Sequence, residues 1–130
     1  MIDIDKATAP FEGAVITKLE MDPFNTKVLI EAKVMGDNDK AISTHKLEVL
    51  NCQSFLWTGY SDFFEKQNTD FKDCNYYEVT AINYKPVLAG STDEWLSQYN
   101  LNYNIIIEIW DNALLIRAQT VIIDGTTFKI

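Results

Sequence analysis

Apolar and polar side chains alternate along much of the chain, most clearly between Leu101 and Ile123. The apolar set of this segment is Leu101, Tyr103, Ile105, Ile107 and Ile109 in the first arm, and Leu114, Ile116, Ala118 and Ile122 in the second. A period of two indicates strands with one buried face. We therefore expect one long β-hairpin over residues 101–123.

Asp111 and Asn112 lie between the two arms, and both tolerate positive φ, which suits a two-residue type I′ turn. This turn would set residue 109 opposite 114 and residue 107 opposite 116, so that the two apolar faces coincide. A slip by one residue would set Ile107 against Arg117, so turn chemistry and burial favour the same register. On the other face, Glu108 is then expected opposite Leu115 and diagonal to Arg117, as a cross-strand ion pair unless Arg117 binds an anionic ligand instead.

A second turn is expected at Asp124 and Gly125. A plain two-residue turn would set Phe128 opposite Val121, off the expected core face. A three-residue loop over 123–125, with Gly125 left-handed in a G1 bulge, sets Phe128 opposite Thr120 and Ile130 opposite Ala118. We expect this second arrangement because it keeps Phe128 and Ile130 with the core.

Further strands are expected in the preceding part of the chain. Residues 14–21 carry Val15, Leu19 and Met21 on one side, and a turn at 22–25 leads to an antiparallel strand over 27–35. A third strand covers 42–50 and extends, bent, toward Trp57. Residues 74–84 are partly apolar on both faces, which predicts a strand in the middle of a sheet. Residues 1–10 are expected to be either a loose tail or a short edge strand.

Two segments favour short helices. Ser61 or Asp62 can cap one helix, and Ser91 and Glu94 have the spacing of a capping box for another. Together the elements predict a mainly β fold, an antiparallel β-sandwich or strongly curved sheet of about seven or eight strands with one or two short helices. The 130 residues are most simply one globular domain, which is long enough to bury a core without disulfides or metals.

The charge of the chain narrows the choice of partners. Its formal net charge is −8, from 19 acidic against 11 basic residues. Such a surface repels nucleic-acid phosphates and anionic membranes, because the electrostatic contribution to binding has the wrong sign. A basic protein partner is favoured, although acidity also serves solubility alone.

The chain lacks a run of about 18 apolar residues and the basic-then-apolar layout of a signal peptide. We therefore expect a cytoplasmic protein, although a leader that had been removed would leave no trace. Cys52 and Cys74 fit a reducing compartment in which both thiols are free, and a disulfide between them is the alternative.

No stretch of the sequence carries a catalytic or cofactor motif, and we expect neither an enzyme nor a bound metal or cofactor. His45 is the one histidine. Its expected role is structural or at the surface, with general base and lone metal ligand as the alternatives. Thr44 cannot meet His45 directly, because neighbours on a strand point to opposite faces. Glu78 and Glu108 leave open a paired-carboxylate glycosidase.

Aromatic side chains stand among acids between residues 60 and 73, a composition that suits the recognition of a basic partner. The residues expected to bind this partner are Tyr60, Asp62, Phe63, Glu65, Asp70 and Asp73. The alternative is that these aromatics close one end of the sheet. A carbohydrate or small-ligand platform would use Trp57, Tyr60, Trp95 or Trp110. Self-association would bury the outward apolar residues Ile106, Trp110 and Leu115.

Three strand segments carry a resemblance to a known family. They are residues 107–125 (IEIWDNALLIRAQTVIIDG), 47–57 (LEVLNCQSFLW) and 76–84 (YYEVTAINY). Together they resemble small, acidic, mostly β proteins of the YxiG-like type, which occur near polymorphic toxins in Gram-positive bacteria. The resemblance implies an immunity-type or accessory protein and brings no site residues with it. It agrees with the charge, since an acidic inhibitor suits a basic toxin.

Overall fold

The structure, a computed structural model, describes residues 3–59, 77–84, 103–110 and 112–130. In chain order its elements are α1 (Ile4–Thr8), η1 (Ala9–Phe11), β1 (Val15–Asp22), β2 (Lys27–Met35), η2 (Asp37–Asp39), β3 (Ala41–Leu50), β4 (Ser54–Gly59), β5 (Ala81–Tyr84), β6 (Ile105–Ile109), β7 (Asn112–Arg117), β8 (Thr120–Ile123) and β9 (Thr126–Lys129). The helices expected after Ser61 and after Ser91 lie outside the described residues.

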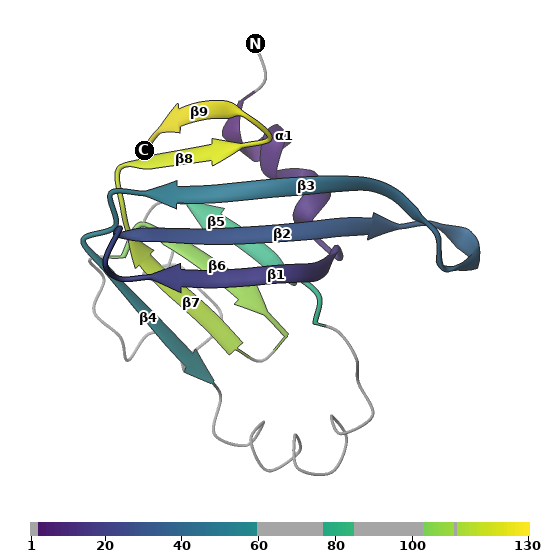
Figure 1. Cartoon of the computed structure of the whole chain (residues 1–130), viewed down its shortest axis with the longest axis horizontal. Coiled ribbons are helices and arrows are strands. Elements are labelled where there is room, and N and C mark those ends of the chain that lie inside the picture. Colours follow the sequence, from purple (N-terminus) through teal and green to yellow (C-terminus); the bar gives the residue numbers. More distant parts are fainter. Residues whose placement is uncertain (1–2, 60–76, 85–102, 111) are drawn as a thin grey trace.

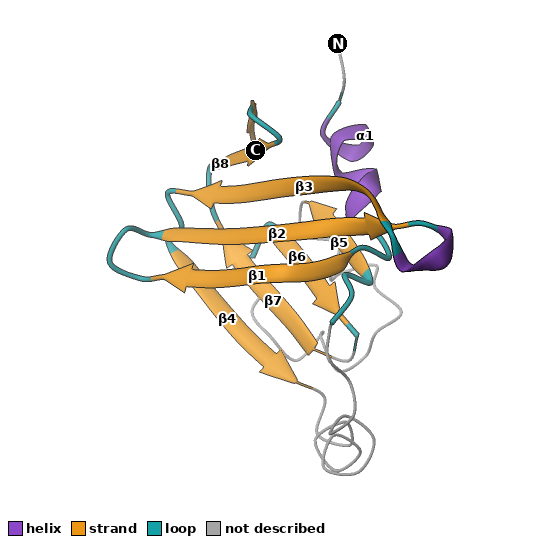
Figure 2. Ribbon diagram, turned by 45° about the vertical axis from the view of Figure 1, so that its right-hand side comes forward, coloured by secondary structure: helices purple, strands orange, loops and turns teal. Residues whose placement is uncertain are grey.

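The strands form two antiparallel sheets. The first sheet has the order β1-β2-β3-β8-β9, and the second has the order β4-β7-β6-β5. The second sheet lies behind the first, and its strands run obliquely to those in front (Figures 1 and 2). The predicted mainly β, antiparallel sandwich is therefore confirmed, and the described part of the chain has nine strands where about seven or eight were expected.

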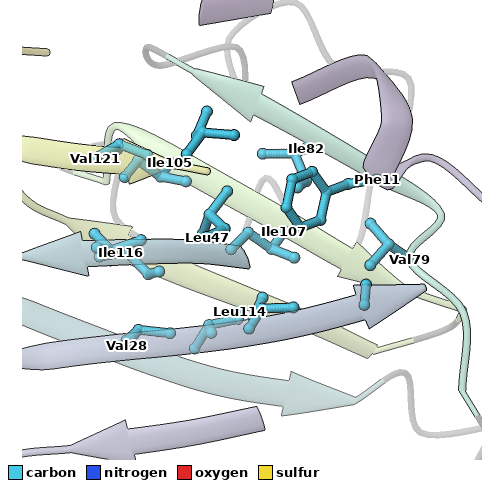
Figure 3. Close-up of a cluster of buried hydrophobic side chains, with 14 of the residues drawn as sticks. Phe11, Val28, Leu47, Val79, Ile82, Ile105, Ile107, Leu114, Ile116 and Val121 are labelled. Atoms are coloured by element: carbon cyan, nitrogen blue, oxygen red, sulfur yellow. The ribbon is translucent and has the colours of Figure 1, made fainter. Parts of the chain in front are cut away.

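The core lies between the two sheets. Ile30 and Leu47 from the first sheet and Ile107 and Leu114 from the second are at most 1% exposed. Figure 3 shows Phe11, from the N-terminal segment, directed toward Ile107 and its neighbours in this core. The core face predicted for the hairpin is confirmed for Ile105, Ile107, Ile109, Leu114, Ile116 and Ala118, which all belong to the core cluster. Tyr103, predicted on the same face, packs instead against Ile106 and Leu115.

The register of the β6–β7 hairpin differs from the prediction by two residues. Ile109 pairs with Asn112, and Ile107 pairs with Leu114. Trp110 adopts φ 53°, and its N–H donates to Thr80 Oγ1 at 2.8 Å. A shift by two keeps every side chain on its predicted face, which is why burial could not reveal the error. It also places Glu108 opposite Ala113, four residues from Arg117, so the predicted diagonal pairing is wrong.

The chain leaves the second sheet after β7 instead of continuing as one long hairpin arm. The side chain of Asn104 occupies this break, since Nδ2 donates to the Ala118 carbonyl at 2.8 Å and Oδ1 accepts from the Ala118 N–H at 3.0 Å. The chain then enters the first sheet as β8, which pairs with β3. The crossing changes which residues face the core. Ile116 and Ala118 face it before the crossing, whereas Val121 and Ile123 face it afterwards and Ile122 does not.

The β8–β9 turn is therefore the two-residue type that the sequence argument rejected. Ile123 pairs with Thr126, and Phe128 pairs with Val121. Both turn residues have positive φ, 49° at Asp124 and 86° at Gly125, as a type I′ turn requires. Because Val121 faces the core, this register brings Phe128 to the core without a bulge.

Two expectations for the other strands need correction. Val15, Leu19 and Met21 were expected to face the core together. A bulge at Thr17 changes the alternation along β1, so Ile16 and Leu19 pack against the core and Val15 and Met21 do not. Residues 77–84 are not a central strand: the N–H of Val79 donates to Ala14 of the first sheet, and β5 pairs with β6 at the end of the second. Both faces of this segment are partly apolar because it passes from one sheet to the other.

The N-terminal residues form a helix, not a tail or an edge strand. Asp3 caps α1, since its Oδ1 accepts from the Lys6 N–H at 2.8 Å. Ile4 and Ala7 pack against the core, and Phe11 is fully buried. The spacing of these apolar residues along the segment is helical, a signal that was present in the sequence and was missed.

A second, smaller cluster covers the outer face of the β6–β7 hairpin. Ile106 is 4% exposed and Leu115 is fully buried, with Tyr103 packed against them. Ile106 and Leu115, together with Trp110, were expected to be buried by self-association. Ile106 and Leu115 are buried within the chain itself, and Trp110 is half-buried.

Candidate functional site

His45 lies on the inner face of β3, near the N-terminal segment. It shares the parity of the buried Leu47 and pairs in register with Ala32, which is 1% exposed. The side chain of His45 is 17% exposed. Its ring lies 5.7 Å from the ring of Phe11, at an interplanar angle of 55°. The imidazole is thus held at the rim of the core, with one edge open to solvent.

Both ring nitrogens of His45 have hydrogen-bond partners. Nδ1 lies 2.7 Å from Oδ2 of Asp124, and Nε2 lies 2.9 Å from Oγ of Ser43. Ser43 reaches the ring because residues two apart on a strand point to the same face. Asp124 reaches it because β3 pairs with β8, whose last residue is immediately followed by Asp124.

Asp124 is held by the backbone of β3 as well as by His45. Its N–H donates to the Lys46 carbonyl at 2.9 Å, and its Oδ1 accepts from the Lys46 N–H at 2.8 Å. Both carboxylate oxygens therefore have a donor. The turn between β8 and β9 is fixed beside β3, one residue beyond the end of their ladder.

This arrangement selects one form of the imidazole. A carboxylate can only accept, so the bond to Asp124 places a proton on Nδ1. In the neutral imidazole, the lone pair of Nε2 then accepts from the Ser43 hydroxyl. The result is a continuous serine–histidine–aspartate hydrogen-bond chain. Such a chain can make a serine nucleophilic, orient an imidazole, or simply fix two strands together.

Sequence reasoning missed this cluster. It correctly set Thr44 aside, since Thr44 pairs with Lys33 and is exposed on the other face, but it did not pursue Ser43. The spacing of Ser43 and His45 was a readable signal. Asp124 lies 79 residues further on, and only the pairing of β3 with β8 brings it there. The structural role expected for His45 agrees with its contacts, and no group of three or more potential metal ligands occurs among the described residues.

Two hollows lie on either side of Asp124. One, of about 450 Å³, opens on the outer face and is lined by Glu31, Thr44 and Lys46 among others. The other, of about 350 Å³, lies between the N-terminal helix and the β8–β9 hairpin, with Pro10 and Phe128 in its lining. The outer hollow is lined by polar and apolar surface in nearly equal parts, and the inner one is mostly apolar.

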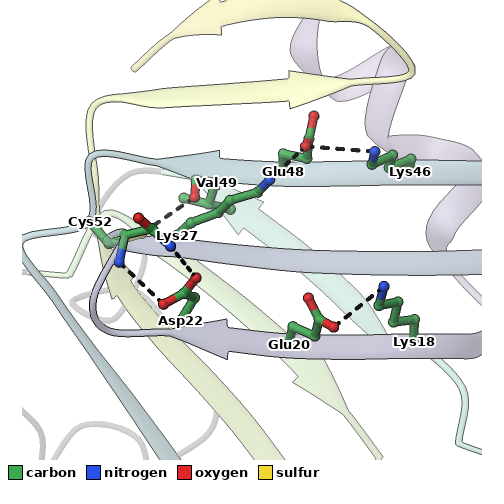
Figure 4. A network of polar contacts seen from close by, with 9 residues as sticks. Lys18, Glu20, Asp22, Lys27, Lys46, Glu48, Val49 and Cys52 are labelled. Carbon is green, nitrogen blue, oxygen red and sulfur yellow. Dashed lines mark hydrogen bonds and ion pairs between the residues drawn. The ribbon is translucent and has the colours of Figure 1, made fainter.

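The outer face of the first sheet carries balanced charges. Lys27 Nζ lies 3.0 Å from Oε1 of Glu48, and Lys46 Nζ lies 3.7 Å from the same oxygen (Figure 4). The hydrogen bond from Lys27 lowers the pKa of Glu48, and Lys46 adds to this effect. Lys18 and Glu20 form a further pair at 3.4 Å. The excess of acids is therefore not concentrated on this face.

The six residues expected to bind a partner lie outside the described part of the chain. The structure does describe the two ends of their segment, at Gly59 and Tyr77. Trp57 and Tyr77 flank the segment and are 38% and 43% exposed. Tyr77 contacts Trp110, with ring centroids 5.3 Å apart and an interplanar angle of 50°. Exposed aromatic rings thus stand at both ends of the acidic segment.

The remaining candidates have ordinary surroundings. Cys52 is a free thiol, 5% exposed, whose pKa is raised by burial, while Cys74 lies outside the described residues. Glu78 forms an isolated bridge with Val15, and Glu108 pairs with Ala81 and Ala113. No helix among the described residues is long and apolar enough to cross a membrane.

Comparison with known proteins gives one positive result. No curated protein and no solved structure matches the chain. A family model described as YxiG-like protein matches residues 4–128. The resemblance expected from the strand segments is therefore confirmed over nearly the whole sequence. The chain belongs to the YxiG-like protein family.

Proposed function

We propose that this protein is an interaction domain that binds a basic protein partner through the segment 60–73 and the aromatic side chains that flank it. This binding involves no chemical step. The observation that carries the proposal is the exposure of Trp57 and Tyr77 at the two ends of a segment that contains four acids and two lysines. Exposed aromatic side chains are enriched at binding surfaces, and the excess of acids in the segment favours a basic partner.

The distribution of charge supports this location. Opposite charges alternate on the outer face of the first sheet, where Glu48 is already paired with Lys27 and Lys46. A basic partner gains little there, because its cations would compete with those lysines. Asp62, Glu65, Asp70 and Asp73, by contrast, follow one another closely, so they can act together on an approaching cation.

Within this reading, the partner is a basic toxin and the protein is its cytoplasmic immunity protein. An inhibitor with a net charge of −8 suits a toxin that acts on nucleic acid, because the surface that binds phosphates is basic. Electrostatic attraction would then speed association, which matters when a toxin must be captured before it acts.

Charge reversal tests the proposal. In the binding variant, lysine replaces Asp62, Glu65, Asp70 and Asp73. In the control variant, lysine replaces four exposed acids elsewhere, Asp5, Glu12, Glu20 and Asp37. Both variants have the same net charge, so they differ only in where the charge lies.

The tagged wild type should capture a basic protein from extract of its host cell at low salt and release it at high salt. The binding variant should lose this protein, and the control variant should keep most of it. With the purified partner, association should slow in the binding variant and depend less on salt. Equal capture by both variants would remove the segment 60–73 from consideration.

A second candidate function is carbohydrate or small-ligand binding. The tilted contact between Tyr77 and Trp110, with the exposed Trp57 on β4, is the observation that favours it, because sugar rings stack on such side chains. Titration with neutral oligosaccharides distinguishes the two functions. A sugar site would be insensitive to salt and to the four reversals, and Trp57→Ala would weaken it.

A further inference from the structure

The proposed function leaves the cluster of Ser43, His45 and Asp124 unused. We propose that Ser43 is an activated nucleophile that takes up the acyl group of small activated esters, with His45 as its general base and Asp124 as the positioning residue. The inference is independent of the proposed binding function, since no residue of the segment 60–73 takes part in it.

The geometry is that of a working serine–histidine pair. The distance of 2.9 Å from Ser43 Oγ to His45 Nε2 is within the range in which a proton can pass directly. The distance of 2.7 Å from His45 Nδ1 to Asp124 Oδ2 is that of a charge-assisted hydrogen bond. Each nitrogen therefore meets the partner that general-base action requires, with Nε2 free to receive the serine proton.

The three side chains are also held in place. Ser43 and His45 lie on β3 and pair in register with Val34 and Ala32 of β2, and the ladder has an irregularity at Ile42, just before Ser43. The ring of Phe11 packs against the imidazole. The Lys46 N–H donates to the carboxylate of Asp124, and the Lys46 carbonyl accepts from the Asp124 N–H. Rigid elements with packed neighbours keep such a group near its productive geometry.

A small reagent can approach Ser43. The residue is half-buried and lies two positions after the exposed Ala41, at the beginning of β3. Figure 1 shows that this end of β2 and β3 projects beyond the second sheet. Its inner face is therefore less covered than the part of β3 that carries Leu47. Because this position is open, small acyl donors fit it better than long chains.

Transfer of the acyl group to Ser43 and its later hydrolysis require only Ser43, His45, Asp124, the ester and water. Ser43 Oγ forms a bond to the acyl carbon of the ester while its proton passes to Nε2 of His45. The bond from the acyl carbon to the leaving oxygen breaks, and the alcohol departs with that proton, or departs as its anion while Nε2 releases the proton to solvent. Water then repeats these steps at the acyl-serine, releasing the acid and restoring Ser43. Asp124 stabilises the imidazolium that forms in each half.

The probes are a fluorophosphonate, which labels active serines with loss of fluoride, and p-nitrophenyl acetate, whose acyl group would be transferred to Ser43. Peptide mass spectrometry identifies the labelled residue. We expect Ser43 to be labelled, with Thr44, exposed on the opposite face of the same strand, as the internal control. A general base contributes about 10²–10⁴-fold, so His45→Gln should slow labelling by roughly 100-fold. Free imidazole should restore part of the rate in His45→Gly.

Asp124→Asn separates positioning from a purely structural role. Asparagine tolerates the φ of 49° at this position, and its amide oxygen can still accept from the Lys46 N–H. The fold and its unfolding midpoint should therefore be nearly unchanged. Labelling of Ser43 should fall by at least about 100-fold, as in His45→Gln, because the amide nitrogen donates to Nδ1 and leaves the ring proton on Nε2, which then cannot accept the serine proton. If Ser43 is labelled no faster than Thr44, or if His45→Gln is labelled like the wild type, the cluster is only a clamp between strands and the proposal is wrong.

Discussion

Phe11 offers the sharpest test of how the fold is held together. It belongs to η1, it is fully buried, and it packs in the core near Ile82 and Ile107 (Figure 3). Its ring also contacts the ring of His45. Phe11→Ala removes the whole ring and leaves a cavity that the strands cannot close, because both sheets are fixed by their ladders. The expected loss is about 3–5 kcal/mol of unfolding free energy. This is a large fraction of the roughly 5–15 kcal/mol that stabilises a typical domain.

The chain provides a matched control, because Phe24 in the β1–β2 turn is 96% exposed. Phe24→Ala should change the unfolding free energy by less than about 0.5 kcal/mol. Urea unfolding followed by tryptophan fluorescence measures both variants, and the Phe11 variant should also melt roughly 10–15 °C lower. A loss below about 1 kcal/mol for Phe11→Ala, or equal losses for the two variants, would mean that the N-terminal segment does not complete the core.

Three further predictions concern single groups. Gly125→Ala should lower the unfolding free energy by about 1–2 kcal/mol, because alanine disfavours the φ of 86° while open space surrounds its methyl group. An unchanged stability in urea unfolding would mean that the turn has another geometry. Burial raises the pKa of Tyr84 to about 12, so its contribution to stability is complete below about pH 10 and is lost as the pH rises through 12. The unfolding free energy of the wild type should fall by up to about 3 kcal/mol over this range, and that of Tyr84→Phe should not. Equal losses in both proteins would contradict this. The hydrogen bond from Lys27 lowers the pKa of Glu48, so this pair stabilises the fold above about pH 4.5 and less so as the pH falls. As the pH falls, the unfolding free energy should decrease less in Glu48→Gln than in the wild type. The difference between the two decreases should be below about 1 kcal/mol.

The candidate site shows where sequence reasoning stops. A period of two was enough to put Ser43 and His45 on one face of β3, because that relation holds within a single strand. Asp124 joins them only through the pairing of β3 with β8, which sequence spacing does not reveal. The acidic segment 60–73 was predicted from composition, and its role as a binding surface stays a prediction that charge reversal can test.

Local alternation by itself determined the strand over 27–35, the antiparallel return from β1 to β2 and the core face of the β6–β7 hairpin. These properties depend on side chains a few residues apart, which the sequence records directly. Tertiary structure decided the register of that hairpin, because a shift by two residues leaves every face unchanged. It also decided the parity of β8, because the chain crosses to the first sheet at Ala118, where the side chain of Asn104 satisfies the backbone. Pairing between distant strands is settled by the burial and hydrogen bonding of the whole sandwich, and no local pattern contains that information.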